Sequence, residues 1–183
     1  MTEGKRTTRI RDKVGNVLAV PLGEDRFGFA WVLDSPLVAF FDRPCRAGDF
    51  PPVDAIVRSP IAFRIWVMKS AVTSGKWPRL GHMPVLEHSL KPLWFFKQDS
   101  INGRIHKTLT GAEEVPATAD EAEGLECAAV WSDVHVEERL RAHFEGRPSI
   151  FAESMRVKPP EFFEAKGNTS STSTPSRRTA DER

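Results

Sequence analysis

The chain has 183 residues, of which 40% are hydrophobic and 28% charged, and its formal net charge is +1. These proportions are typical of a soluble globular protein with one domain, with or without tails. Its uncharged apolar runs are far shorter than the roughly 20 residues that a membrane span needs, so no membrane association is expected. The basic N-terminus lacks the apolar stretch of a secretory signal. Two cysteines without a CxxC spacing, Cys45 and Cys127, predict reduced thiols in a cytoplasmic protein.

Charge is distributed unevenly along the chain. Residues 1–110 hold 17 Lys and Arg against 10 Asp and Glu, whereas residues 111–183 hold 9 against 15. A protein that mainly grips nucleic acid usually carries a large basic excess throughout. The distribution therefore argues against nucleic acid as the main partner.

The two ends of the chain differ from its middle. Residues 1–12 are expected to form a flexible basic segment. Residues 165–183, "AKGNTSSTSTPSRRTADER", contain no large apolar residue and cannot bury enough surface to repay their ordering. This composition predicts a disordered tail rich in Ser and Thr, and it leaves residues 13–164 as a single folded domain.

The first half of the chain consists of short apolar runs separated by turn residues, which predicts strands. Residues 16–22 and 26–33 are expected to form a hairpin with its turn at Gly23, because glycine tolerates left-handed backbone geometry. Gly28, between two phenylalanines, indicates a kink or a close backbone approach. Alternation places four side chains of the second strand on one face, where they are expected to meet a small core: Phe27, Phe29, Trp31 and Leu33. Further strands are expected within residues 37–42, 61–68, 77–83, 93–97 and 104–109.

The back half has helical signals. The sequence Thr-Ala-Asp-Glu at 118–121 fits a capping box and predicts a short helix. Residues 125–131 alternate as one further strand. Ser132 or Asp133 could cap a second helix, which Gly146 would terminate. The sequence therefore predicts an α+β fold with a small, mostly antiparallel β-sheet or partly open barrel and one or two C-terminal helices.

Motifs for metal or cofactor chemistry are weak. The glycines fit neither a P-loop nor a dinucleotide fingerprint. The best metal-like group consists of His82, Glu87 and His88, but its H-x5-H spacing is interrupted by Pro84. A zincin helix needs two imidazoles on one helical face, and this spacing does not provide them. Neither a metal nor a cofactor is expected.

Nucleophilic catalysis also has little support. Cys45 lies between Arg43 and Arg46, which could lower the pKa of its thiol. No G-x-S-x-G elbow is present. A hydrolase that uses Cys45 or the region of His82 and His88 remains a third interpretation of the sequence.

Aromatic residues with basic neighbours raise the question of nucleic acid. Phe27, Phe29 and Trp31 could form a stacking platform on a small β-barrel, with nearby arginines at phosphates. In the competing interpretation these rings belong to the core. The core is favoured because the opposite face of that strand is too small to fill a barrel. A nucleic-acid-binding small β-barrel stays as the alternative function.

An ordered series of motifs resembles a known family. The stretch "GNVLAVPLGEDRFGFAWVL" at 15–33, followed by "LVAFFD" at 37–42, resembles the N-terminal signature of the immunity protein 26 family of bacterial polymorphic toxin systems. Asn16 stands where Asp is commoner in that signature. Further similar stretches are Ser59-Pro60 with Phe63, residues 75–84, Pro92 and residues 124–146.

The resemblance implies an immunity protein that binds and neutralises a cognate toxin domain by surface complementarity, without catalysis. Residues 111–164 hold 13 acidic against 5 basic side chains, and such a patch would steer a basic toxin towards it. Alternatively, these charges only solvate a loop and a helix. The residues expected to bind the toxin lie on a segment that has the character of an accessible loop: Glu113, Glu114, Asp120, Glu121, Glu123 and Glu126.

Overall fold

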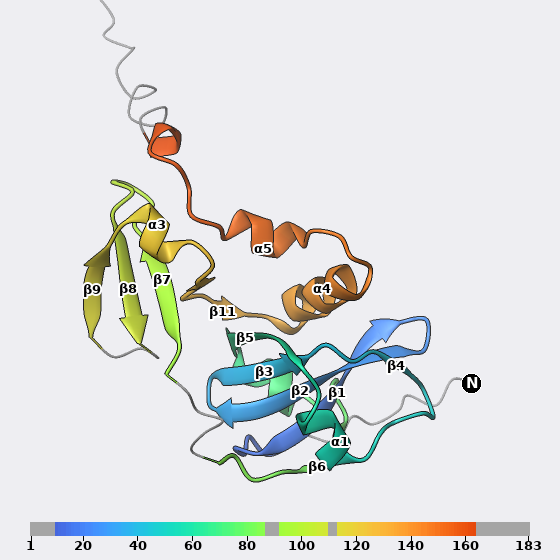
Figure 1. Cartoon of the computed structure of the whole chain (residues 1–183). Helices are drawn as coiled ribbons and strands as arrows, with labels where there is room; N and C mark the ends of the chain where they lie inside the picture. Colours follow the sequence, from blue (N-terminus) through green and yellow to red (C-terminus); the bar gives the residue numbers. More distant parts are fainter. Residues whose placement is uncertain (1–9, 87–91, 110–112, 164–183) are drawn as a thin grey trace, which may run out of the picture.

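The computed structural model describes residues 10–86, 92–109 and 113–163, so the tail predicted at 165–183 and most of the predicted basic segment lie outside it (Figure 1). A seven-stranded sheet, here the large sheet, has the strand order β11-β5-β3-β2-β1-β6, with β4 paired to β2. Its strands are β1 (Asn16–Gly23), β2 (Arg26–Asp34), β3 (Leu37–Phe41), β4 (Cys45–Arg46), β5 (Ile61–Val67), β6 (Arg79–His82) and β11 (Val130–Trp131).

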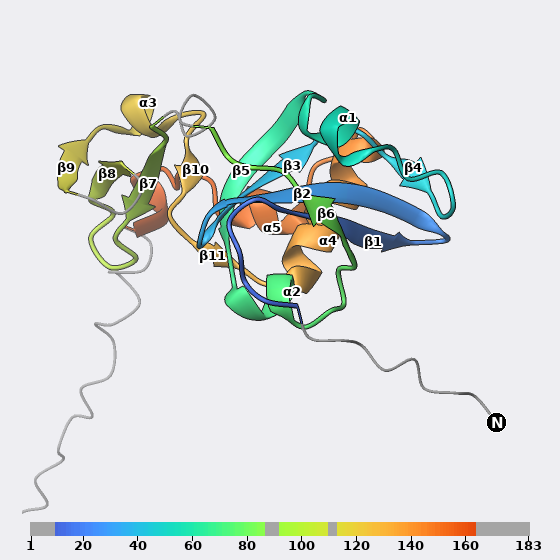
Figure 2. The same ribbon diagram turned by 90° about the horizontal axis from the view of Figure 1, so that it is seen from below.

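A four-stranded sheet, here the small sheet, lies beside the large sheet (Figures 1 and 2). Its order is β10-β7-β8-β9, and its strands are β7 (Trp94–Gln98), β8 (Ile105–Leu109), β9 (Glu114–Ala117) and β10 (Glu126–Cys127). Both sheets are mostly antiparallel, and neither closes into a barrel. The predicted α+β fold is therefore confirmed in its open-sheet form.

Helices cover the large sheet on both faces. On one face lies α1 (Val53–Val57), and on the other lie α2 (Lys69–Thr73) and α4 (Asp133–Phe144), with α5 (Ile150–Ser154) packed against α4. The remaining helix, α3 (Ala119–Ala122), lies against β8 of the small sheet. Ser132 caps α4, as one of the two predicted caps, by accepting a hydrogen bond from the backbone N–H of His135. The sequence did not predict α1, α2 or α5, because five residues are too few to display a helical period. Among the described residues, no helix is long and apolar enough to cross a membrane.

The predicted hairpin of β1 and β2 is confirmed. Its turn residues Glu24 and Asp25 have φ angles of 50° and 57°, and Gly23 has a φ of 86°. A two-residue turn with both central φ angles positive matches the twist of the strands that it joins. The left-handed stretch therefore extends over three residues, although only one of them is glycine.

Strand β2 is buried on both faces. Phe29 and Trp31 join Ile56 of α1 in one apolar cluster, whereas Ala30 joins Leu140 of α4 in the other. Phe27 is only half-buried, and its ring makes an edge contact with Phe50 at 5.1 Å between centroids. A Cβ placed on Gly28 would lie 3.2 Å from Leu140, which confirms the close approach predicted at this glycine.

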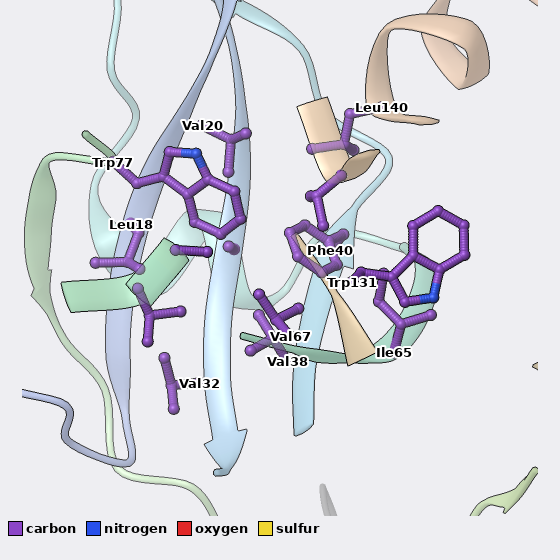
Figure 3. Packing of buried hydrophobic residues seen from close by; sticks show 14 of the residues in the cluster. Leu18, Val20, Val32, Val38, Phe40, Ile65, Val67, Trp77, Trp131 and Leu140 are labelled. Atoms are coloured by element: carbon purple, nitrogen blue, oxygen red, sulfur yellow. The ribbon is translucent and has the colours of Figure 1, made fainter. Parts of the chain in front are cut away.

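The cluster under α4 consists of aliphatic side chains packed around a few large aromatic rings (Figure 3). Trp77 is fully buried and meets Phe40 edge to face, with ring centroids 6.2 Å apart. Its indole Nε1 donates a hydrogen bond to Glu137 Oε1 of α4 at 2.9 Å, and Lys76 Nζ lies 2.9 Å from the same oxygen. This polar pairing fixes α4 against the sheet, because a buried indole N–H needs an acceptor.

The prediction of a single strand over residues 125–131 is wrong. Glu126 and Cys127 pair in parallel with β7 of the small sheet, whereas Val130 and Trp131 pair in parallel with β5 of the large sheet. Between them, Ala128 donates its backbone N–H to Phe96 O, and the chain then passes to the other sheet. Alternating residues in the sequence cannot indicate this change of partner, because both halves keep an extended backbone.

Candidate functional site

The acidic segment is built from regular structure rather than from the predicted loop. Glu114 begins β9, Asp120 and Glu121 belong to α3, and Glu126 begins β10. The predicted capping box is confirmed: Thr118 Oγ1 accepts from the backbone N–H of Glu121, whose carboxylate accepts from the backbone N–H of Thr118 at 2.9 Å. Regular structure therefore fixes the backbone of these four residues, and the capping box also fixes the carboxylate of Glu121.

The small sheet separates two of these carboxylates. Glu114 lies opposite Thr108 on β8 and forms an ion pair with Lys97 of β7. Lys107, the neighbour of Thr108, points to the other face and lies 2.7 Å from Glu121 of α3. Because successive side chains of a strand point to opposite faces, the two ion pairs lie on opposite sides of the sheet. The six predicted residues therefore do not form one continuous patch.

The pKa values of Glu114 and Glu121 are both lowered by these contacts. The hydrogen bond from Lys97 holds the pKa of Glu114 below its ordinary value. The hydrogen bond from Lys107, followed by that from the backbone of Thr118, lowers the pKa of Glu121. Both groups are ionised at neutral pH, and each negative charge is matched by a cation of the same chain.

Glu126 joins the two sheets. Its carboxylate receives two hydrogen bonds from the Arg139 guanidinium of α4, at 2.9 and 2.6 Å. The guanidinium carbon lies 4.1 Å from the ring centroid of Phe63 and 5.0 Å from that of Trp131. A planar guanidinium suits such a two-pronged, stacked arrangement. Glu126 is thus occupied with holding β10 against α4.

Three of the predicted residues are exposed and have no ion pair within the described ranges: Glu113, Asp120 and Glu123. Asp120 and Glu123, together with Glu126, line a cleft of about 680 Å³. The wall opposite α3 is formed by α5 and the segment that follows it, and the lining includes Phe96, Leu125, Trp131, Met155, Val157 and Pro159. The cleft therefore has an acidic side and an apolar interior.

The sequence did not predict the cleft or the roles of Arg139 and Trp131 beside it. Their roles depend on β10, α4 and α5 meeting in space, although β10 and α5 are more than 20 residues apart. The two-pronged pair of Arg139 with Glu126 spans 13 residues, so it does not appear as an i,i+3 or i,i+4 pattern. No local signal in the sequence indicates this site.

The thiols do not have the character of nucleophiles. Burial and the nearby carboxylate of Asp49 raise the pKa of Cys45, although Arg43 acts in the opposite direction. The predicted lowering of its pKa is therefore wrong, because desolvation of the thiolate exceeds the attraction of the guanidinium. Burial, together with the charge of Glu126, also raises the pKa of Cys127.

The metal-like group is only partly visible. His82 lies exposed on β6, while Glu87 and His88 fall outside the described residues. Within residues 10–86, 92–109 and 113–163, no group of three His, Cys, Asp or Glu side chains is placed to hold a metal ion.

Two of the three rings considered as a stacking platform belong to the core. Phe29 is fully buried and Trp31 is 6% exposed, and the indole Nε1 of Trp31 donates to the backbone oxygen of Met83 at 3.1 Å. Bases cannot stack on rings that are covered on both sides. The core interpretation is confirmed for Phe29 and Trp31, whereas Phe27, the third ring considered, is only half-buried.

These features describe an open α+β protein that presents charge and a cleft at its surface. The sequence model of the family described as Immunity protein 26 matches residues 13–106, and the chain belongs to this family. The match runs from just before β1 into β8, so all six predicted acidic residues and the stretch at 124–146 lie beyond it. No match was found among curated proteins or among solved structures.

Proposed function

We propose that this immunity protein acts in the bacterial cytoplasm by binding a cognate toxin domain of a polymorphic toxin system. It neutralises the toxin by covering a functional surface and carries out no reaction of its own. The observation that carries this proposal is the set of exposed, unmatched carboxylates at Glu113, Asp120 and Glu123 in the described part of a chain from an immunity family.

Electrostatics supports a basic partner. Glu114, Glu121 and Glu126 are matched by cations of the same chain, so a partner would gain little from meeting them. Asp120 and Glu123 are unmatched among the described residues, and they lie beside a cleft that a partner could enter. A toxin that acts on nucleic acid carries a basic surface for phosphates, which such carboxylates would attract and occupy.

The first experiment measures affinity for the toxin domain encoded by the adjacent gene. The charge-reversed variant Asp120→Lys/Glu123→Lys is expected to bind at least about 100-fold more weakly, because two attractive contacts become repulsive. The matched control Asp34→Lys/Asp49→Lys makes the same change in net charge at two exposed residues away from the cleft. Unchanged affinity of the first variant, or an equal loss in the control, would overturn the assignment of this surface.

A second measurement separates binding from catalysis. The variant Cys45→Ala/His82→Ala/His88→Ala removes the side chains that a hydrolase could use. If protection depends on stoichiometric binding, cells that make the toxin survive with this variant as they do with the natural chain. Loss of protection by a variant that keeps the native circular dichroism spectrum would overturn the non-catalytic mechanism.

A further inference from the structure

We infer that the cleft between α3 and α5 receives an extended segment of the toxin in which a Lys or Arg stands next to an apolar residue. The inference rests on the proposed function and specifies which part of the partner enters the immunity protein. The volume of the cleft, about 680 Å³, is within the range of sites that enclose a ligand of a few side chains.

The interior of the cleft selects an apolar side chain. Phe96 forms part of its lining from β7, Leu125 from the segment before β10, and Met155 from the end of α5. Pro159 and Pro160 extend this lining along the segment that follows α5. Water that fills such a cavity gains few hydrogen bonds, so an apolar group that replaces it binds favourably.

The charges of the cleft select a cation. Arg139 is neutralised by Glu126, and Arg156 lies 2.8 Å from Glu153. These pairings leave Asp120 and Glu123 as its only unmatched charges within the described residues. A Lys or Arg of the partner would therefore complete the charge balance of the site, whereas an acidic segment would be repelled.

An unused donor favours a peptide over an isolated side chain. Trp131 lines the cleft and is 1% exposed, and its indole Nε1 has no hydrogen-bond partner in the described part of the chain. Buried N–H groups are nearly always paired, so a small turn of this ring towards the cleft would gain a hydrogen bond from any ligand that brings an acceptor. An extended peptide presents a backbone carbonyl at each residue, which supplies such an acceptor together with its side chains.

Both walls of the cleft are already held in place. The capping box fixes α3, and the two hydrogen bonds from Arg139 fix β10. The segment after α5 is tied to the small sheet by Gln98, whose amide donates to Lys158 O at 2.9 Å and accepts from Lys158 N at 2.7 Å. A preformed site loses little entropy when the partner binds, which favours a tight complex.

The test blocks the cleft without changing its charge. Ala119 lines the cleft and is exposed, so Ala119→Trp places a large side chain there while the fold is kept. We expect this variant to bind the adjacent-gene toxin domain at least about tenfold more weakly. The matched control is Ala47→Trp, at an exposed position next to β4, which should bind as the natural chain does.

A photo-crosslinking amino acid at position 119 identifies the occupant. In the full chain mixed with the toxin domain, we expect crosslinks to one toxin segment that contains a Lys or Arg beside an apolar residue. Crosslinks to residues 164–183 of the same chain, or to an acidic toxin segment, would overturn the inference. Unaltered toxin affinity of Ala119→Trp would overturn it while leaving the proposed function intact. Absence of binding by the natural chain would instead reject the proposed function and the inference together.

Discussion

The two sheets are stabilised in different ways. The large sheet has apolar side chains on both faces, and Val17, Leu18 and Phe40 on its central strands are completely buried. The small sheet contacts that core chiefly through Phe95, whose ring lies 4.7 Å from Trp66. Its two sides carry the ion pairs of Lys97 with Glu114 and of Lys107 with Glu121. Apolar packing therefore stabilises the large sheet on both faces, whereas the small sheet carries ion pairs on both of its faces.

The two sheets also differ in how much of each the family match covers. The family match ends within β8, so it covers nearly all of the large sheet but leaves out β9, α3 and β10. Apolar packing constrains the large sheet strongly, because most changes to a close-packed core are destabilising. Exposed charges near the cleft can change at little cost in stability. We propose that the small sheet and its cleft carry the specificity for the toxin.

The largest expected effect is the removal of a tryptophan from the large-sheet core. Trp77→Ala leaves a cavity and deprives the Glu137 carboxylate of a buried donor, so the free energy of unfolding should fall by about 3–5 kcal/mol. Trp31→Ala, at a second buried ring, should lower it by a similar amount of about 3–5 kcal/mol. Urea denaturation monitored by circular dichroism measures both.

A tryptophan of the small sheet provides the matched control for Trp77→Ala. Trp94 is 42% exposed, and its ring lies 5.8 Å from Lys107 Nζ. Trp94→Ala should lower the free energy of unfolding by about 1 kcal/mol or less, since little buried area is lost. Equal losses for Trp77→Ala and Trp94→Ala would contradict the contrast between the two sheets.

An intermediate effect is expected where the sheets are joined. Arg139→Ala removes two charge-assisted hydrogen bonds to Glu126 and two ring contacts, and it should lower the free energy of unfolding by about 1–3 kcal/mol. Arg139→Lys should recover only part of this loss, because an ammonium cannot form the two-pronged pair. A double-mutant cycle with Glu126→Gln isolates the interaction. Faster amide exchange should be confined to β10 and its neighbours if this pair is the junction.

The contrast also explains what could be predicted from the sequence. The β1–β2 turn, the capping box at Thr118 and the burial of Trp31 follow from short stretches whose chemistry determines local geometry. The passage of residues 125–131 from one sheet to the other depends on partners far along the chain. Likewise, no local pattern indicates that Lys97 and Lys107 neutralise two of the predicted carboxylates. Site prediction therefore failed where tertiary pairing decides which charges remain available.

The smallest effect concerns stability in acid. It tests whether the two ion pairs of the small sheet lie on opposite faces. The pKa values of Glu114 and Glu121 lie below the ordinary value of 4.5 in the folded chain, because lysines stabilise their ionised forms. The folded protein therefore binds fewer protons than the unfolded chain, so these pairs stabilise the small sheet above pH 4.5 and lose that contribution as the pH falls through the lowered pKa values. Carboxyl-detected NMR titration should show that Lys107→Ala raises the pKa of Glu121 and leaves that of Glu114 low, while Lys97→Ala does the reverse. A common rise of both pKa values in either variant would mean that the two carboxylates share one face of the sheet.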